Sequence, residues 1–469
     1  MNLLLIHSDQ HRYDCIRAHG MRELETPNLD RLCAEGTRFS RAYSTIPICT
    51  PARASLLTGT WPHHHGSFCI PTAELNRAAR PELPTFFTEL KKKGYRTGWV
   101  GKYHQELECS SPGEAEGVDD FRPIWNYKQM RKASGQEPIP KTHGLFGDED
   151  TVSSPENSPL AWQADQVIDQ IRSGSGQPFC LRWDPPEPHL PCNPVTEFAS
   201  RYHAEEIPPW QSFPDPQDGK PAAQKRQKKI WGLEDWTWEQ WQPVVRLYYG
   251  IITELDHHIG RVLDTLDQLG LAKDTLVIYS TDHGDYCGGH GQMDKHFNMY
   301  DDVTHVPLIA RLPGRIPAGA TCEAFASNEL DIARTLLEAA GAEVPESFAG
   351  ENLIGMANGA TPREVITSQY FGTESGAYSM RMIRDDRYKF VYHPVGDMHE
   401  LYDLQEDPGE LNNRIDDPGL IDVQRCLKAR LWDEMKAQGD RLASRWTKVE
   451  LQSEPPMAVE IYGDHCPSS

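Results

Sequence analysis

The sequence predicts an α/β protein: a large, mostly parallel sheet flanked by helices, followed by a smaller C-terminal α+β subdomain. Short strand-like runs, several of them continuously apolar as expected for strands buried on both faces, lie at residues 3–6, 96–101, 178–183 and 275–280. An amphipathic pattern over residues 245–270 predicts a long helix immediately before the last run. Strands that alternate with helices in this way favour a parallel sheet.

The N-terminal residues predict a buried strand rather than a targeting segment. The apolar run at residues 3–6 has no basic residue before it and ends at polar residues 7–9, so it is too short for the core of a signal peptide. On this basis we expect a cytoplasmic protein. The next element is a helix that begins near Pro27, because proline is favoured in the first turn of a helix.

A change of composition near residue 360 predicts a domain boundary. Glycine and proline become frequent over residues 350–365. Shorter strand-like runs and one helical pattern follow, at residues 379–383, 388–392 and 418–438. We therefore predict a catalytic α/β domain over residues 1–360 and a C-terminal α+β subdomain with a tail over residues 361–469.

The stretch 203–243 is rich in Pro, Trp, Lys and Gln, and we predict a long surface excursion there. Four tryptophans lie within it, at positions Trp231, Trp236, Trp238 and Trp241. Their rings could stack on a sugar or an aryl ring of a ligand. The alternative, which we favour, is a Trp-rich helix packed on the sheet.

The composition excludes several classes of protein. The chain has 469 residues, with 47 Lys+Arg and 69 Asp+Glu, which gives a formal net charge of −22. Nucleic acid is therefore not an expected partner, and an anionic substrate would need cations gathered locally. The longest apolar runs span only a few residues, so no membrane-spanning helix is predicted. The 11 cysteines include no C-x-x-C pair, which argues against a disulfide framework and against a thiolate zinc site.

The strongest signal for function is the run CTPARASLLTG at residues 49–59. It resembles the signature of the formylglycine-dependent (type I) sulfatases, in which C-x-P-x-R directs oxidation of the cysteine to formylglycine. The match continues at Pro62, His65 and Gly66. The resemblance implies that Cys49 is the catalytic residue and that a formylglycine-generating maturation enzyme is a partner of the chain.

The chemistry of sulfate transfer explains why such a modification is useful. A thiol that attacked a sulfate ester would form a thiosulfate-like adduct from which sulfate is not easily expelled. A hydrated aldehyde carries two hydroxyls on one carbon: one attacks sulfur and displaces the alcohol, and the other then loses its proton and expels sulfate as the carbonyl reforms. The nucleophile needs a cation to lower its pKa. Arg53, one helical turn after Cys49, can hold the aldehyde hydrate.

Two acidic segments are expected to supply a metal site. Asp9 and Gln10 follow the first predicted strand, and Asp282 and His283 follow the strand at 275–280. Carboxylates at the C-terminal ends of neighbouring parallel strands converge on one crevice. These segments resemble those of the alkaline-phosphatase-like superfamily, which implies one divalent cation held by both segments and by residue 49. Oxygen-rich coordination favours Ca²⁺, our first expectation, or Mg²⁺, and a histidine ligand is also compatible with Mn²⁺.

Four further residues resemble the cationic and acid–base residues of the sulfatases. Lys102 and His104 lie in a G-K-x-H segment, His189 lies in a P-H-x-P segment, and Lys295 follows the second acidic segment. By electrostatics, Lys102 and Lys295, with Arg53, would neutralise charge on the sulfuryl oxygens. His104 would take the proton in the release step, and His189 with Lys295 would protonate the leaving alkoxide.

The sequence therefore predicts a sulfatase that hydrolyses sulfate monoesters of small carbohydrates or of aryl or alkyl alcohols. One alternative is a phosphonate or phosphate ester hydrolase of the same superfamily. In phosphonate monoester hydrolases the Lys and His of G-K-x-H are typically Tyr and Thr, so Lys102 and His104 favour sulfate. A second alternative, a non-catalytic binder of sulfated glycans, would be expected to have lost part of the set Cys49, Arg53, Asp9 and Asp282, all of which are present. The sequence predicts neither the oligomeric state nor the natural substrate.

Overall fold

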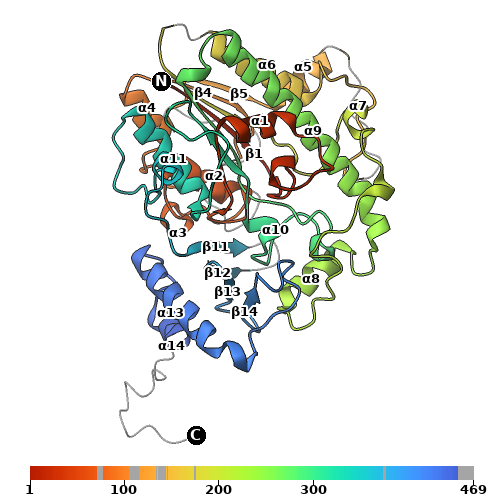
Figure 1. The fold of residues 1–469 in the computed structure, drawn as a ribbon, viewed down its shortest axis with the longest axis vertical. Helices are drawn as coiled ribbons and strands as arrows, with labels where there is room; N and C mark the ends of the chain where they lie inside the picture. Colours follow the sequence, from red (N-terminus) through yellow and green to blue (C-terminus); the bar gives the residue numbers. More distant parts are fainter. Residues whose placement is uncertain are drawn as a thin grey trace, which may run out of the picture.

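The computed structural model is built on one central sheet of eight strands (Figure 1). It describes residues 1–70, 78–104, 116–133, 135, 144, 146–173, 176–372 and 377–452. In sheet order the strands are β5 (Asp120–Pro123), β4 (Arg96–Gly101), β6 (Phe179–Asp184), β1 (Asn2–Ser8), β7 (Thr275–Thr281), β8 (Leu308–Arg311), β2 (Thr37–Phe39) and β9 (Ala320–Cys322). Only β8 runs antiparallel to its neighbours, so the predicted mostly parallel sheet is confirmed.

Strand β1 shows why these short apolar runs become central strands. Leu4 and Ile6 pack into the core on one face of the sheet, whereas Leu3 and Leu5 pack into the core on the other face. Because side chains point alternately to the two faces of a sheet, a strand made only of apolar residues removes all of them from water only when both faces are covered. The strand is covered accordingly, and each of its seven residues is buried.

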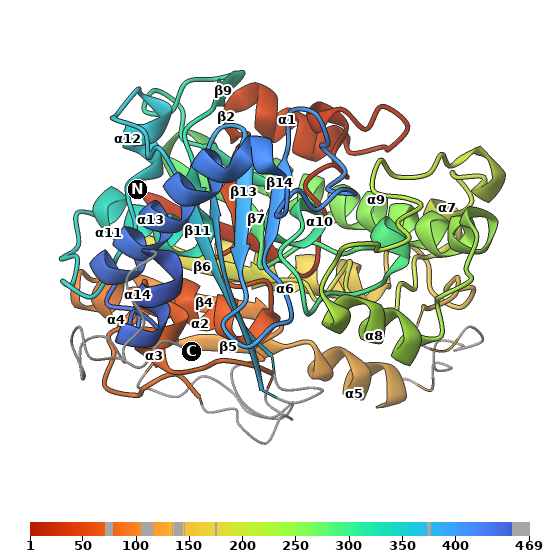
Figure 2. The ribbon, with the colours of Figure 1, turned by 90° about the horizontal axis from the view of Figure 1, so that it is seen from below.

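Helices cover both faces of the sheet, as Figures 1 and 2 show. The first face carries α1 (Pro27–Glu35), α6 (Pro159–Arg172) and α9 (Trp238–Gln268), and the second carries α2 (Cys49–Thr58), α4 (Phe86–Lys92) and α11 (Asn328–Ala340). The helix predicted at 245–270 is thus confirmed as α9, which begins seven residues earlier. Its capping box at Thr237 explains the earlier start, because this cap satisfies backbone groups of the first turn.

Shorter elements complete the chain. The helices are α3 (Pro62–His65), α5 (Trp125–Ala133), α7 (Thr196–Ala199), α8 (Ala222–Trp231), α10 (Asp301–Thr304) and α12 (Leu353–Ala357). A two-stranded parallel sheet pairs β3 (Ala42–Tyr43) with β10 (Ala326–Ser327).

The C-terminal part forms a second, antiparallel sheet, which confirms the α+β character predicted for it. Its strands are β11 (Ile366–Gly372), β12 (Tyr378–Arg384), β13 (Tyr388–Tyr392) and β14 (Glu400–Asp403), in that order. Helices α13 (Ile421–Ala437) and α14 (Arg445–Leu451) pack on one face of it through a separate apolar cluster. In Figure 1 this sheet lies below the main body. The boundary at residue 360 itself stays a prediction.

The stretch 203–243 differs from the predicted surface excursion. It contains α8 and the first turns of α9, and Trp238 and Trp241 are buried in the main core. The ring of Trp241 packs against those of Trp236 and Phe146. The packing alternative is therefore correct for this group of tryptophans, whereas Trp231 is 37 % exposed.

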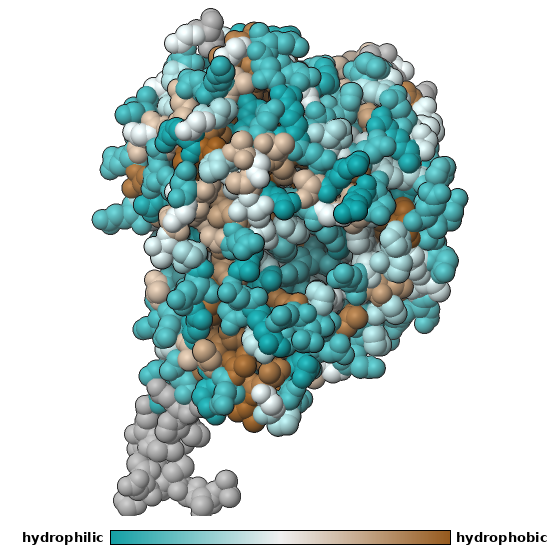
Figure 3. All heavy atoms as spheres, in the orientation of Figure 1, coloured by the Kyte–Doolittle hydropathy of each residue, from teal (hydrophilic) through white to brown (hydrophobic). Residues whose placement is uncertain are grey.

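The surface in one view is mostly hydrophilic. Figure 3 shows hydrophilic atoms over most of one face, with the largest group of apolar atoms low in the view, over the C-terminal part. Among the described residues, no helix is long and apolar enough to cross a membrane.

A buried lysine joins the C-terminal sheet to the main body. Lys389 on β13 donates hydrogen bonds to Asp301 on α10 (2.5 Å), to Glu410 (2.7 Å) and to the carbonyl of Met299 (3.0 Å). Its side chain is fully buried. Burial raises the pKa of Glu410, whereas the charge of Lys389 lowers it. The lysine therefore helps to keep this buried carboxyl ionised.

Replacing Lys389 with methionine should destabilise the protein by about 3–5 kcal/mol, because it leaves the buried carboxylate of Glu410 without its cation. Chemical denaturation followed by tryptophan fluorescence measures the loss. Arg425→Met is the matched control, because Arg425 pairs with Asp422 at 2.7 Å on the exposed surface and should leave the midpoint nearly unchanged. Equal midpoints for the two variants would contradict the structural role assigned to Lys389.

Candidate active site

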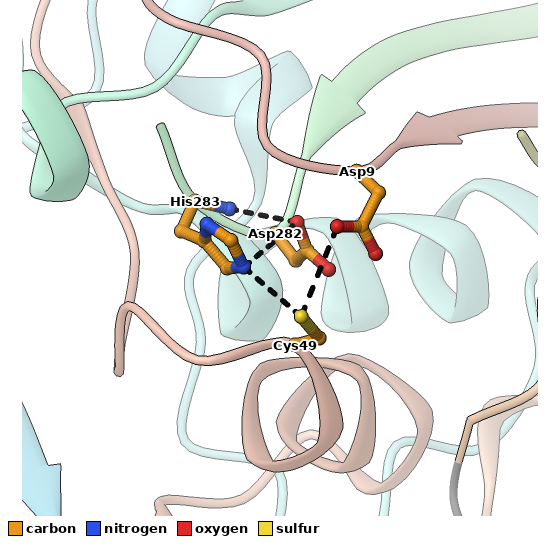
Figure 4. A group of neighbouring side chains, drawn as sticks. All are labelled: Asp9, Cys49, Asp282 and His283. Carbon is orange, nitrogen blue, oxygen red and sulfur yellow. Dashed lines mark hydrogen bonds and ion pairs between the residues drawn. The ribbon is translucent and has the colours of Figure 1, made fainter. Parts of the chain in front are cut away.

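Four predicted residues meet at the C-terminal edge of the parallel sheet (Figure 4). Asp9 follows β1, and Asp282 and His283 follow β7; because Ser8 and Thr281 are in register, both segments leave the sheet at the same level. Cys49 is the first residue of α2. The ligand atoms of these four buried residues all lie within 4.8 Å of one another. The Cys49 Sγ lies 3.2 Å from His283 Nε2 and 3.8 Å from Asp9 Oδ1.

Arg53 lies one turn after Cys49 on α2 and is fully buried. Its Nη2 donates to Asp9 Oδ2 at 2.8 Å and lies 3.0 Å from Asp282 Oδ2. Its Nη1 donates to Asp184, the last residue of β6. Burial opposes the positive charge, but Asp282, Asp184 and Asp9 raise the pKa of Arg53, so it stays protonated. The guanidinium therefore balances the acids through Nη1 and Nη2, and its buried Nε has no hydrogen-bond partner among the described residues.

Lys102 and Lys295 approach the cluster from different segments. Lys102 Nζ donates to Asp9 Oδ2 at 2.6 Å, and Lys295 Nζ lies 3.2 Å from Gln10 Oε1. Although burial and the Asp9 carboxylate oppose ionisation, the two lysines and His283 hold the pKa of the Cys49 thiol well below its ordinary value. The position of residue 49 thus stabilises negative charge, helped by the N-terminus of α2.

His189 and Lys295 form a hydrogen-bonded pair. The Nδ1 of His189 lies 2.6 Å from the carbonyl oxygen of Leu190, which can only accept, so Nδ1 carries the proton. The Nε2 is then the acceptor for Lys295 Nζ at 3.3 Å. Lys295 also donates to Asp294 at 2.8 Å. The predicted proton-donating pair is therefore assembled at one side of the cluster.

His104 lies close to Cys49 and to the hydroxyl of Thr50, with 3.4 Å between His104 Nδ1 and Thr50 Oγ1. Burial, and then the charge of Lys102, lowers the pKa of His104. The imidazole is consequently neutral near neutral pH and can accept a proton. Its backbone is left-handed, with a φ of 47°, a conformation that non-glycine residues rarely adopt outside functional sites.

Gln10 lies at the margin of the cluster. Its Nε2 donates to Asp285 Oδ2 at 2.6 Å, and its Oε1 accepts from Lys295, which leaves one lone pair on Oε1. Its backbone N–H donates to Asp282 Oδ1 at 3.1 Å. The predicted metal ligand Gln10 is therefore close to the cluster, with its amide oriented by Asp285.

The donor set fits a divalent cation. Two buried carboxylates, an imidazole nitrogen and the side chain of residue 49 face one point, and burial together with the Asp9 carboxylate raises the pKa of Asp282. A cation between the two acids would relieve this repulsion. Hard oxygen donors of this kind suit Ca²⁺ or Mg²⁺.

Asp184 and Arg182 are functional neighbours that the sequence analysis missed. Arg182 Nε donates to Asp184 Oδ1 at 2.7 Å, and its guanidinium lies over the Trp99 ring at 4.1 Å from the centroid. Asp184 in turn holds Arg53. The rule that placed Asp9 and Asp282 at strand ends applies equally to Asp184 at the end of β6, and it could have identified this residue.

Comparison with known proteins agrees with the geometry. The family model for sulfatases matches residues 1–342, and the model "N-sulphoglucosamine sulphohydrolase, C-terminal" matches residues 288–437. The chain is similar to an arylsulfatase of Clostridium perfringens, with 29 % identity over 88 % of this chain and 90 % of the relative. It is also similar to an N-acetylglucosamine-6-O-sulfatase of Bacteroides thetaiotaomicron, with 25 % identity over 94 % of this chain and 87 % of the relative.

A solved structure shares the fold. The phosphonate monoester hydrolase of Agrobacterium radiobacter superposes with a TM-score of 0.80 and 23 % identity, covering 93 % of this chain and 96 % of that one. The sulfatase family match spans most of the 469 residues and includes every predicted site residue. The chain therefore belongs to the sulfatase family, and it is a sulfuric ester hydrolase of the alkaline-phosphatase-like superfamily.

Proposed function

We propose that the protein hydrolyses sulfate monoesters of small molecules, with Cys49 matured to formylglycine and one divalent cation bound beside it. The observation that carries the proposal is the meeting of Cys49 with Asp9, Asp282 and His283 in a buried cluster flanked by lysines. Maturation would require a formylglycine-generating enzyme as partner.

Asp9, Asp282, His283 and residue 49 would hold the cation, with Gln10 Oε1 as a further oxygen donor at the margin. When bound, the cation would lower the pKa of the nucleophile, and the formylglycine hydrate would supply that nucleophile and a route for releasing sulfate. Ca²⁺ is the expected ion because most of the donors are oxygens.

The remaining residues would bind the ester and move protons. The charges of Lys102 and Lys295 lower the pKa of the residue 49 side chain, and the two lysines would contact the sulfuryl oxygens. The Lys295–His189 pair would deliver a proton to the leaving alkoxide oxygen. His104, neutral because of burial, would accept the proton of the hydroxyl that remains on residue 49.

A phosphonate ester hydrolase is the second candidate, favoured by the fold shared with the Agrobacterium enzyme. The residues favour sulfate instead. Lys102 and His104 stand where phosphonate monoester hydrolases typically carry Tyr and Thr.

Maturation of Cys49 can be tested directly. After expression with a formylglycine-generating enzyme, mass spectrometry of the tryptic peptide spanning residues 42–53 should show loss of the cysteine sulfur and gain of an aldehyde. Cys426, which is exposed, should remain a thiol in the same digest. Full sulfatase activity from protein with an unmodified Cys49 would refute the proposed chemistry.

The metal site predicts a sharp effect of Asp282→Ala. The variant should lose the bound cation and its turnover together, since the carboxylate is both a donor and part of the charge that attracts the ion. Metal content by atomic spectroscopy and hydrolysis of an aryl sulfate measure the two losses. Asp422→Ala, at a carboxylate that is 93 % exposed, is the control and should change neither. Undiminished activity of Asp282→Ala in metal-free buffer would contradict the site.

His104→Ala should separate the two half-reactions. Ester cleavage should continue and sulfate release should slow by about 10²–10⁴-fold, the usual contribution of a general base, so one alcohol is released per enzyme in a burst. Lys102→Ala should slow both half-reactions, because its charge is used in each transition state. Rapid-quench kinetics distinguish the two patterns, with His203→Ala at an exposed histidine as control. Loss of the burst in His104→Ala would assign this residue to ester cleavage instead.

A further inference from the structure

An apolar groove of about 330 Å³ lies beside Lys295, outside the cluster described above. Its walls come from helix α8, from the segment after Lys295 and from the C-terminal sheet. Its main side chains are Arg226, Ile230, Phe297, Tyr378, Val395 and Asp397. Most of the lining is apolar, and no residue of the proposed catalytic set is part of it.

Helix α8 turns polar side chains toward the core and an apolar side chain toward the surface, the reverse of most surface helices. Its buried residues are Gln224 and Gln227, whereas Ile230 is 61 % exposed. Gln224 donates to Glu400 at 3.0 Å and accepts from the Tyr300 hydroxyl at 2.7 Å. A surface helix normally turns its apolar residues to the core. Here the core side is polar and held by the hydrogen bonds of Gln224 and of Gln227 Nε2, so the apolar face is left toward the groove.

Two strongly exposed apolar side chains line this groove. Eight large apolar side chains are exposed in the part of the chain that the structure describes. Two of them, Ile230 (61 %) and Val395 (72 %), line the groove from opposite walls, and Trp231 (37 %) is adjacent in sequence. Apolar surface concentrated in a concave site marks a place where a ligand is bound.

The groove adjoins the segment that carries Lys295. Gln227 Nε2 donates to the backbone carbonyl of Lys295 at 2.6 Å, which fixes α8 against the segment that carries this lysine. Phe297 lies two residues further on, within about 7 Å along the chain. Because Lys295 and His189 would protonate the leaving group, the leaving group of a bound ester would lie on the side of the cluster that adjoins this segment.

The backbone that positions Phe297 is strained. Asp294, His296 and Phe297 all have left-handed conformations, with φ values of 64°, 95° and 57°. Such residues persist only where surrounding contacts impose them, and they are concentrated at functional sites. The Asp294–Lys295 ion pair at 2.8 Å and the Gln227 hydrogen bond supply those contacts.

Charge selects between apolar and polyanionic substrates. The chain carries a net charge of −22, which disfavours the approach of molecules with many sulfate groups. Within the groove, Arg226 is matched by Asp397, so no excess of positive charge is present to bind a second sulfate.

We propose that this groove binds the ring of an aryl leaving group, so that the preferred substrates are aryl sulfate monoesters rather than polysulfated glycans. The inference rests on the proposed sulfatase function and assigns Ile230, Phe297 and Val395 to substrate selection. These side chains contact the alcohol portion of the ester and take no part in proton transfer.

Steady-state kinetics of the matured, metal-loaded enzyme test the proposal with para-nitrophenyl sulfate and a sulfated monosaccharide. The double variant Ile230→Asp/Val395→Asp should raise KM for the aryl ester roughly tenfold or more, because apolar contacts discriminate by that order. Its kcat and its kinetics with the sulfated monosaccharide should stay within about threefold of the wild type. Leu269→Asp, at an exposed leucine just after α9, is the matched control and should change nothing.

Equal effects on the two esters, or no effect on either, would overturn the assignment of the groove. A binding measurement that needs no turnover gives an independent answer: naphthalene sulfonate should quench tryptophan fluorescence of the unmatured protein, and the double variant should bind it at least about tenfold more weakly. Unchanged binding by the double variant would also overturn the proposal. If the wild type hydrolyses neither ester, the sulfatase proposal fails, while the binding measurement still decides the groove.

Discussion

The active site depends on one buried guanidinium. Arg53 contacts carboxylates that end three adjacent strands, β6, β1 and β7, through Asp184, Asp9 and Asp282. Removing these charges from water is costly, and removing one partner of a buried pair typically costs about 3–5 kcal/mol. The three strand ends, α2 and the nucleophile position are thus fixed by one side chain. A site on strand ends and a helix start is more rigid than one on loops.

The residues that surround Arg53 and its three carboxylates support this arrangement. Asp184 accepts hydrogen bonds from Arg182 as well as from Arg53, and Arg182 lies over the Trp99 ring in the core. The charge network is therefore anchored in the apolar packing of β4 and β6. On the solvent side, Lys102 and Lys295 close the same network through Asp9 and Gln10. The cations thus occur in two layers, one formed by Arg53 and Arg182 and one formed by the two lysines that we propose bind the sulfate group.

Much of the site can be predicted from sequence because it follows local rules. Asp9 and Asp282 come directly after apolar strands, and neighbouring parallel strands bring such ends together. The signature at Cys49 adds the nucleophile. The sequence does not predict which polar side chains become buried through tertiary contacts. The glutamines of α8 resemble those of a solvated helix, and they are buried because Tyr300, Glu400 and the Lys295 carbonyl supply partners.

The charges of the network explain how an acidic protein can admit an anionic ester. With histidines counted as neutral, five carboxylates face four cationic side chains: Asp9, Asp184, Asp282, Asp285 and Asp294 against Arg53, Arg182, Lys102 and Lys295. The network alone is thus negative by one charge, and it becomes neutral when His283 is protonated, because, against the effect of burial, Asp282 raises the pKa of His283 to about 9. In neither state does it attract a sulfate monoester. A divalent cation would reverse that sign and leave a single positive charge, which one sulfate ester neutralises. In a buried site, where charges interact strongly, the proposed cation would therefore favour substrate binding as well as catalysis. It also favours an ester with one negative charge over one with several.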